Sequence, residues 1–102
     1  MANVYKNSKV DLVNTNNTSL YTVPSDSRAI IKSLLVSEDA GSGTTIDVTL
    51  VNAAGTVFSL FKLKTVGANT TIQLLTEPLV LMESEILKVK AADANELHVV
   101  AT

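Results

Sequence analysis

Apolar and polar residues alternate along most of this chain in short runs, and turn-forming residues separate the runs. The period of two is cleanest where Ile46, Val48 and Leu50 alternate with threonines and an aspartate, which indicates a strand with one buried face. Short strands at even spacing are typical of an all-β sandwich or barrel. The pattern predicts strands at residues 4–13, 20–23, 28–38, 45–50, 56–64, 70–75, 79–82, 85–90 and 97–100.

These runs amount to eight or nine short strands and no helix within 102 residues. A chain of this length has room for one domain, so we expect a single domain over residues 1–102. Eight antiparallel strands in two packed sheets form a jelly roll. The sequence therefore predicts an all-β, antiparallel, jelly-roll-like β-sandwich.

Residues 28–38 form the longest predicted strand, and both of its faces carry apolar side chains. If the strand alternates simply, one face carries Ile30, Leu34 and Val36 together with Lys32. The other face carries Ala29, Ile31 and Leu35. We therefore expect a central strand that is covered, at least in part, on both sides. The same residues fit helical spacing, but Pro24 upstream and the β-branched context favour the strand.

A hairpin is predicted at Asn52–Gly55, where the glycine can adopt a positive φ. The returning strand, Thr56–Lys64, should direct alternate apolar residues toward the core: Val57, Phe61 and Leu63. Phe58 and Leu60 then project from the opposite face. Phe58 is either covered by a neighbouring loop or belongs to a surface for a partner or a second copy.

The N-terminal segment admits two interpretations. Residues 1–13 are either the first strand of the sandwich or an arm, Ala2–Val13, that adds a strand to a neighbour. The segment lacks the basic start and apolar stretch of a signal peptide, and no apolar run approaches the ~20 residues that span a bilayer. We expect a soluble protein that is made in the cytoplasm and contacts no membrane.

Composition narrows the possible functions. The net charge is −2 with only eight scattered Lys and Arg, whereas a nucleic-acid-binding domain normally carries a basic face. The chain has no cysteine, which excludes disulfides, thiolate zinc sites and thiol nucleophiles. With four aromatic residues and no tryptophan, it offers no stacking platform for single-stranded nucleic acid or carbohydrate.

Few residues are candidates for chemistry. His98 is the only histidine; without a second histidine or a cysteine it is expected to be an ordinary strand residue. Glu83 and Glu85, with Glu77 at some distance, match no calcium loop and are expected to lie in a solvated turn. The segment Asp39–Gly43 lacks the lysine and the following helix of a phosphate-binding loop. We therefore predict no catalytic, cofactor-binding or metal-binding residues.

Two longer stretches resemble a widespread group of small tailed-phage virion proteins. One is Tyr21–Pro24, read Tyr-Thr-Val-Pro, followed by the long strand Arg28–Val36; the other is Pro78–Val89, followed by small residues and a closing valine-rich strand. The resemblance implies a β-sandwich that serves as an accessory virion component, often assembled as trimers or rings. Such proteins are capsid decoration (cement) proteins or parts of the neck and tail.

From this resemblance we expect a non-enzymatic virion structural protein, most specifically a capsid decoration protein that binds and stabilises the assembled head. Its expected partners are the major capsid protein or other virion proteins, and further copies of itself, with a homotrimer favoured. The alternatives are a neck or tail structural protein and a tail-borne receptor-binding module. No cofactor is expected.

Overall fold

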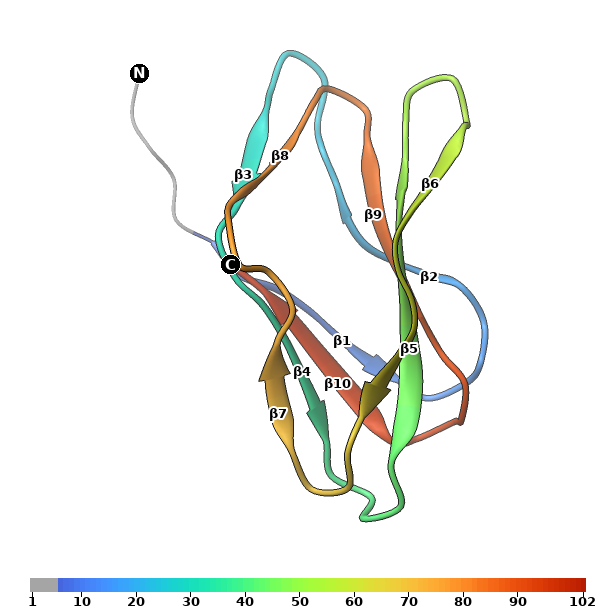
Figure 1. The fold of residues 1–102 in the computed structure, drawn as a ribbon. Helices are drawn as coiled ribbons and strands as arrows, with labels where there is room; N and C mark the ends of the chain where they lie inside the picture. Colours follow the sequence, from blue (N-terminus) through green and yellow to red (C-terminus); the bar gives the residue numbers. More distant parts are fainter. Residues whose placement is uncertain (1–5) are drawn as a thin grey trace.

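A computed structural model describes residues 6–102 of the chain, and within this range every regular element is a β-strand (Figure 1). Within residues 6–102, the structure contains no helix that is long and apolar enough to cross a bilayer. The ten strands are β1 (Ser8–Leu12), β2 (Thr18–Thr22), β3 (Ala29–Ile31), β4 (Leu34–Glu38), β5 (Thr44–Val51), β6 (Val57–Val66), β7 (Thr71–Gln73), β8 (Leu79–Leu81), β9 (Ile86–Ala91) and β10 (Leu97–Ala101).

The strands pair as one long hairpin that has been rolled up. The first strand pairs with the tenth, the second with the ninth, the third with the eighth, the fourth with the seventh and the fifth with the sixth, all antiparallel. Two more antiparallel pairings, β4 with β10 and β5 with β9, close the roll. The result is two four-stranded sheets, β1-β10-β4-β7 and β2-β9-β5-β6, and a two-stranded sheet, β3-β8. The predicted jelly-roll-like sandwich is confirmed.

The core lies between the two four-stranded sheets and is almost wholly aliphatic. Its fully buried members come in alternate positions from the facing strands, as period-two patterning requires; they include Leu34, Val36, Leu97 and Val99 from one sheet and Ile46, Val48, Leu87 and Val89 from the other. Only three polar residues among those described are buried: Glu38, Thr44 and Glu96. All three lie at or next to the ends of strands at one end of the sandwich.

The hairpin predicted at Asn52–Gly55 is confirmed. The backbone N–H of Asn52 donates to the carbonyl oxygen of Thr56 at 3.0 Å, and the N–H of Gly55 donates to the carbonyl of Asn52 at 2.9 Å. Gly55 has a φ of 88°, a conformation that costs glycine little. This turn is the fold point of the rolled hairpin.

The single strand expected over residues 28–38 is wrong, because a β-bulge divides it into β3 and β4. The backbone N–H groups of Lys32 and Ser33 both donate to the carbonyl oxygen of Thr102, at 2.7 and 3.1 Å. Two residues therefore oppose one, which is the signature of a bulge and shifts the alternation by one residue. Ile31 and Leu34 are buried as a result, while Ile30 is exposed. The split accounts for ten strands in place of eight or nine.

Strand β6 also departs from simple alternation. Its pairing with β5 shifts register between Ile46 and Val48 and again between Val48 and Thr49, and Leu63 has a φ of 52°. Phe61 packs against the core as expected, but Val57 and Leu63 are exposed and Leu60 packs against the core, so these three predicted directions are wrong. The backbone N–H of Leu63 instead donates to Oδ1 of Asp47 at 2.7 Å.

At the N-terminus, Ser8–Leu12 forms β1, which lies at the edge of its sheet and pairs with β10 of the same chain. The earlier part of the proposed arm, including Ala2–Tyr5, lies outside the described residues.

The alternation of buried and exposed residues along β4 predicts that two neighbouring leucines contribute very differently to stability. Leu34 is fully buried and Leu35 is 38% exposed. We expect Leu34→Ala to lower the free energy of unfolding by about 2–5 kcal/mol, because it removes buried methyl groups and leaves a cavity. Leu35→Ala, the matched control, should cost less than about 1.5 kcal/mol. Urea denaturation followed by circular dichroism would measure both, and equal losses would contradict the assignment of faces.

Candidate functional site

A buried carboxylate closes one end of the sandwich. Glu38 is the last residue of β4 and is 2% exposed. Its Cα partner across the ladder is Leu97, which is itself opposite Leu12, so Glu38 occupies the end of an otherwise apolar inward-facing row. A charge placed there is stable only if it is fully hydrogen-bonded.

Four backbone N–H groups satisfy this carboxylate. Oε1 accepts from Gly41 at 2.9 Å and from Asn69 at 3.1 Å, while Oε2 accepts from Gly43 at 2.9 Å and from Ser42 at 3.3 Å. The glycine-rich loop that lacks the features of a phosphate site thus does surround an anion, and that anion belongs to the chain. Gly41 and Gly43 have φ values of 86° and 74°, which lets successive N–H groups converge.

These hydrogen bonds lower the pKa of Glu38 from its ordinary value of 4.5 to about 2. The bond from the Asn69 N–H is the largest cause; burial acts in the opposite direction, and the N–H groups of Gly41, Gly43 and Ser42 add to the lowering. Each bond favours the ionised form because a carboxylate can only accept. Sequence reasoning missed Glu38, since the loop containing Asn69 is distant in the chain.

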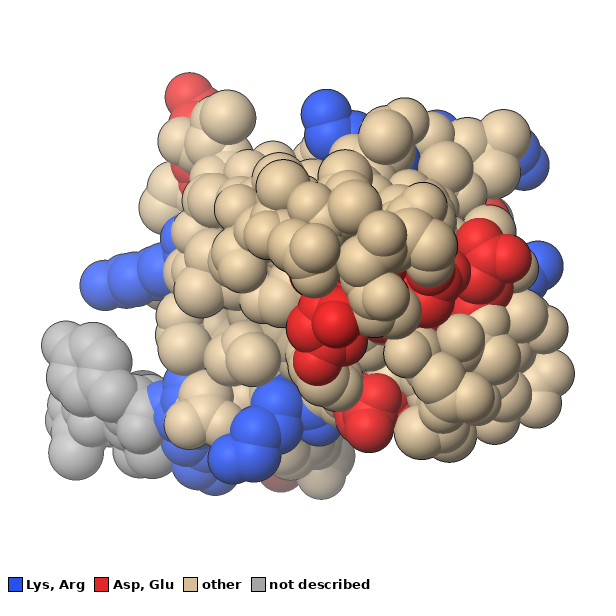
Figure 2. All heavy atoms as spheres, turned by 90° about the horizontal axis from the view of Figure 1, so that it is seen from below, with Lys and Arg blue, Asp and Glu red and all other residues tan. Residues whose placement is uncertain are grey.

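Two further polar pairs tie the β9–β10 loop to the same end. The hydroxyl of Thr44 donates to Oδ2 of Asp93 at 2.7 Å, and the hydroxyl of Ser42 donates to Oε1 of Glu96. An open hollow of about 500 Å³ lies between these loops. Figure 2 looks onto this end and shows acidic side chains across its middle, with basic ones nearer the margin. Since these carboxylates bond to hydroxyl groups of the chain, the end is organised as a structural cap.

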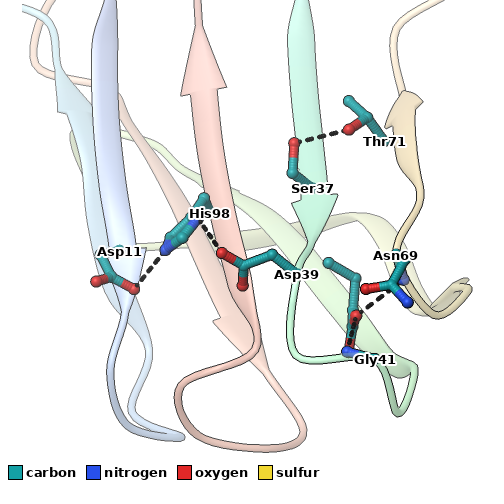
Figure 3. Close-up of polar contacts among 8 residues, drawn as sticks. Asp11, Ser37, Asp39, Gly41, Asn69, Thr71 and His98 are labelled. Atoms are coloured by element: carbon teal, nitrogen blue, oxygen red, sulfur yellow. Dashed lines mark hydrogen bonds and ion pairs between the residues drawn. The ribbon is translucent and has the colours of Figure 1, made fainter.

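His98 lies near the same end, on the outer face of the sheet that contains β4, and its ring is between two carboxylates (Figure 3). Its Nε2 is 3.2 Å from Oδ1 of Asp11, on β1, and its Nδ1 is 3.4 Å from Oδ2 of Asp39, just after β4. Only the protonated imidazolium donates from both nitrogens. The side chains are about half exposed, and exposed ion pairs of this kind contribute at most about 1 kcal/mol to stability.

A serine is the cross-strand neighbour of this histidine, but the two side chains do not form a nucleophile–base pair. Ser37 is the Cα partner of His98, yet its hydroxyl lies 3.0 Å from Oγ1 of Thr71, on the opposite side. Figure 3 shows both ring nitrogens directed at carboxylates. The geometry is that of a strand histidine in a polar surface row.

The acidic residues near residue 84 behave as turn residues. Glu85 accepts from the backbone N–H of Met82 through Oε1 at 2.7 Å, across the turn between β8 and β9. Within residues 6–102, no three His, Cys, Asp or Glu side chains are grouped so that they could hold a metal ion.

Exposed apolar side chains gather in two places. The first is the β3–β8 patch, which we define as Ile30, Val80 and Met82; they are 57, 54 and 45% exposed. Ile30 and Val80 are direct cross-strand partners. The second place lies on β6, where Phe58 is 49% exposed; no neighbouring loop covers it fully.

Searches against protein families, curated proteins and solved structures found no match to this chain. The resemblance to phage virion proteins therefore stays a prediction from the residues.

The hydrogen bonds to Glu38 predict a specific dependence of stability on pH. Since the pKa is lowered on folding, the ionised carboxylate stabilises the fold above about pH 4.5, and this stabilisation is lost as the pH falls through about 2. At pH 7 we expect Glu38→Gln to lower the melting temperature by at least about 5 °C, because an amide nitrogen then faces N–H donors.

The difference in melting temperature between the wild type and Glu38→Gln should shrink between pH 4.5 and 2, because protonation removes the same acceptor in the wild type. Glu83→Gln, in the β8–β9 turn, is the matched control and should follow the wild type. A Glu38→Gln difference that stays constant down to pH 2 would contradict the assigned role.

Proposed function

We propose that this chain is a non-enzymatic structural protein of a tailed-phage virion, and most specifically a capsid decoration protein that docks on the assembled head. The observation that carries the docking role is the β3–β8 patch. It presents three large apolar side chains on and directly after a two-stranded sheet, and two of them are direct cross-strand partners. The assignment to a virion rests on the resemblance of Tyr21–Val36 and Pro78–Val89 to that family.

The size of the patch favours binding to an assembly over binding to a single subunit. Complete burial of a large aliphatic side chain stabilises by about 1.5–3 kcal/mol, and each of the three is already about half buried. Their docking would then supply roughly 3 kcal/mol in total. A contact of that size corresponds to a dissociation constant above about 1 mM.

Several linked copies overcome this weakness. When one copy of an oligomer has docked, the next docks at a high effective concentration, so the whole binds far more tightly than each part. An assembled shell offers repeated sites at fixed spacing, and an unassembled coat subunit does not. Multivalent docking favours an oligomer on an assembled shell; we take the homotrimer, which the resemblance implies, as the docking unit and the assembled major capsid protein as the partner.

The first prediction concerns this selectivity. Purified chain should co-sediment with the assembled, expanded capsids of its virus and should not bind the unassembled coat protein. Multi-angle light scattering should give a trimer. Association with purified tails in place of heads, or a six- or twelve-membered ring, would replace the decoration role by a neck or tail role; binding to host cells or polysaccharide would indicate a receptor-binding module.

The second prediction concerns the patch. Val80→Asp should weaken co-sedimentation with capsids by about tenfold or more per docking copy, because a carboxylate must then be desolvated. Val57→Asp is the matched control, since Val57 is a similarly exposed valine (59%) at the hairpin end of β6. Both variants should melt near the wild-type temperature, because both side chains are exposed. Equal loss of binding, or no loss, would remove the β3–β8 patch as the contact.

A further inference from the structure

Strand β1 is bonded to the rest of its chain mainly through β10. It lies at the edge of its sheet, and its five register pairs are all with β10. Its ion pair, from Asp11 to His98, also goes to β10. Among residues 6–102, the one side-chain hydrogen bond from β1 to β2 is donated by the hydroxyl of Ser8 to the carbonyl oxygen of Leu20.

The place that β1 fills beside β10 fits the side chains of this strand. Leu12 is 1% exposed and Val10 packs against the core. On the outer face, Oδ1 of Asp11 lies 3.2 Å from Nε2 of His98. An occupant of this place therefore needs two apolar residues with a carboxylate between them. Strand β1 of a second copy meets this requirement by identity, so it can replace the chain's own strand without loss of contacts.

The loop from β1 to β2 does not fix β1 to its own chain. Residues 13–17 are all exposed, and each hydrogen bond of the loop joins residues only two apart in the chain. The N–H of Val13 donates to the carbonyl of Asp11 (3.0 Å), the N–H of Asn16 donates to Oδ1 of Asn14 (2.9 Å), and the hydroxyl of Thr18 donates to the carbonyl of Asn16 (3.1 Å). Within the described part of the chain, no hydrogen bond joins this loop to a segment beyond its two flanking strands. The loop can therefore change direction without losing contacts to the rest of the fold.

The loop is also longer than its path between the two sheets requires. Five extended residues reach ~17 Å, whereas packed sheets lie about 10 Å apart. Figure 1 shows the loop between β1 and β2 curving outward at the margin of the molecule. The loop thus has the length to carry β1 across to an adjacent copy.

We propose that three copies of this chain exchange β1 in a closed ring. Each copy places its β1 beside β10 of the next copy and receives β1 from the previous one. The inference rests on the proposed function, from which it takes the homotrimer, and it names the contact that holds the trimer together. Such an exchange repeats between copies the contacts that one chain already makes. Val13, which is 54% exposed in the single chain, becomes covered where the loops of neighbouring copies meet.

The direction of the backbone groups identifies a residue pair that reports the exchange. The carbonyl of Leu12 accepts from the N–H of Asn95, on the side of β10, so by alternation the backbone groups of Lys9 point away from β10. Lys9 and Val100 are therefore a non-hydrogen-bonded pair with Cα atoms about 4.5 Å apart. This spacing admits a disulfide, and the chain has no cysteine of its own to compete.

The test is the double variant Lys9→Cys/Val100→Cys of the full-length chain, oxidised and analysed on a non-reducing denaturing gel. Strand exchange predicts disulfides between chains and hence a covalent species of three chains. The matched control is Ser37→Cys/Thr71→Cys, a cross-strand pair of β4 and β7 whose hydroxyl oxygens lie 3.0 Å apart. The control should form its disulfides within single chains only.

Mixed single variants give a second readout. When Lys9→Cys and Val100→Cys chains are unfolded in urea and refolded together, only exchange brings the two sulfurs beside each other. The yield of mixed disulfide should exceed that from Ser37→Cys with Thr71→Cys chains by about tenfold or more, because a held pair has a far higher effective concentration than colliding chains. Equal yields, disulfides confined to single chains of the double variant, or a covalent dimer as the end product would overturn the proposal.

Light scattering and capsid binding separate this proposal from the proposed function. A trimer in which the double variant closes its disulfides within each chain would reject the exchange and retain the trimeric docking unit. Covalent trimers that do not co-sediment with capsids would reject the capsid role and retain the exchange. A monomeric chain would reject the exchange, whatever it binds.

Discussion

The carbonyl oxygen of Thr102 accepts two backbone N–H groups, and the surface of the molecule near β3 depends on that contact. Because Lys32 and Ser33 oppose a single residue, the inward-facing parity changes from odd in β3 to even in β4. Without that change, Ile30 would share the buried row of Leu34 and Val36, and Ile31 would face outward. The bulge therefore exposes Ile30 beside its cross-strand partner Val80.

The C-terminal end of β4 is stabilised by a different interaction. There the inward-facing row ends in Glu38, and the fold satisfies its carboxylate with N–H groups from two loops. A leucine at this position would continue the core but would leave those four N–H groups without their acceptor. The low pKa of Glu38 keeps the anion ionised at ordinary pH, so the loops after β4 and before β7 are held together by the same side chain. Strand β4 is thus fixed by backbone contacts at its start and by its own carboxylate at its end.

The sequence predicts the class of fold because alternation is a local property. Ile46 and Val48 face the core as their spacing predicts, and Asn52–Gly55 turns the chain where the glycine suggests. The errors arise where a distant residue sets the local geometry. The bulge at Lys32 depends on Thr102, and the position of Leu63 depends on Asp47.

The candidate site could be predicted from the sequence only in part, because it too depends on residues that are distant in the chain. Nothing in the residues around Ile30 shows that the alternation will shift, so the β3–β8 patch appears in sequence as half of a buried strand. Glu38 appears as one of many surface acids until the loop of Asn69 is placed beside it. One local signal was available: a glutamate followed directly by a loop with two nearby glycines, where N–H groups can converge on an anion.

The side chains of the patch suit a contact that is weak in each copy and repeated in many. Ile30 and Val80 are β-branched, so each has few rotamers to lose when a partner covers it. Their strands are paired with each other, and the bulge holds β3 to the C-terminal residue. Docking therefore has to order few further groups. Because the entropy cost of ordering is small, more of the modest free energy of apolar burial remains as binding free energy. Met82, with three rotatable bonds, is the member of the patch that can adapt to the shape of the partner.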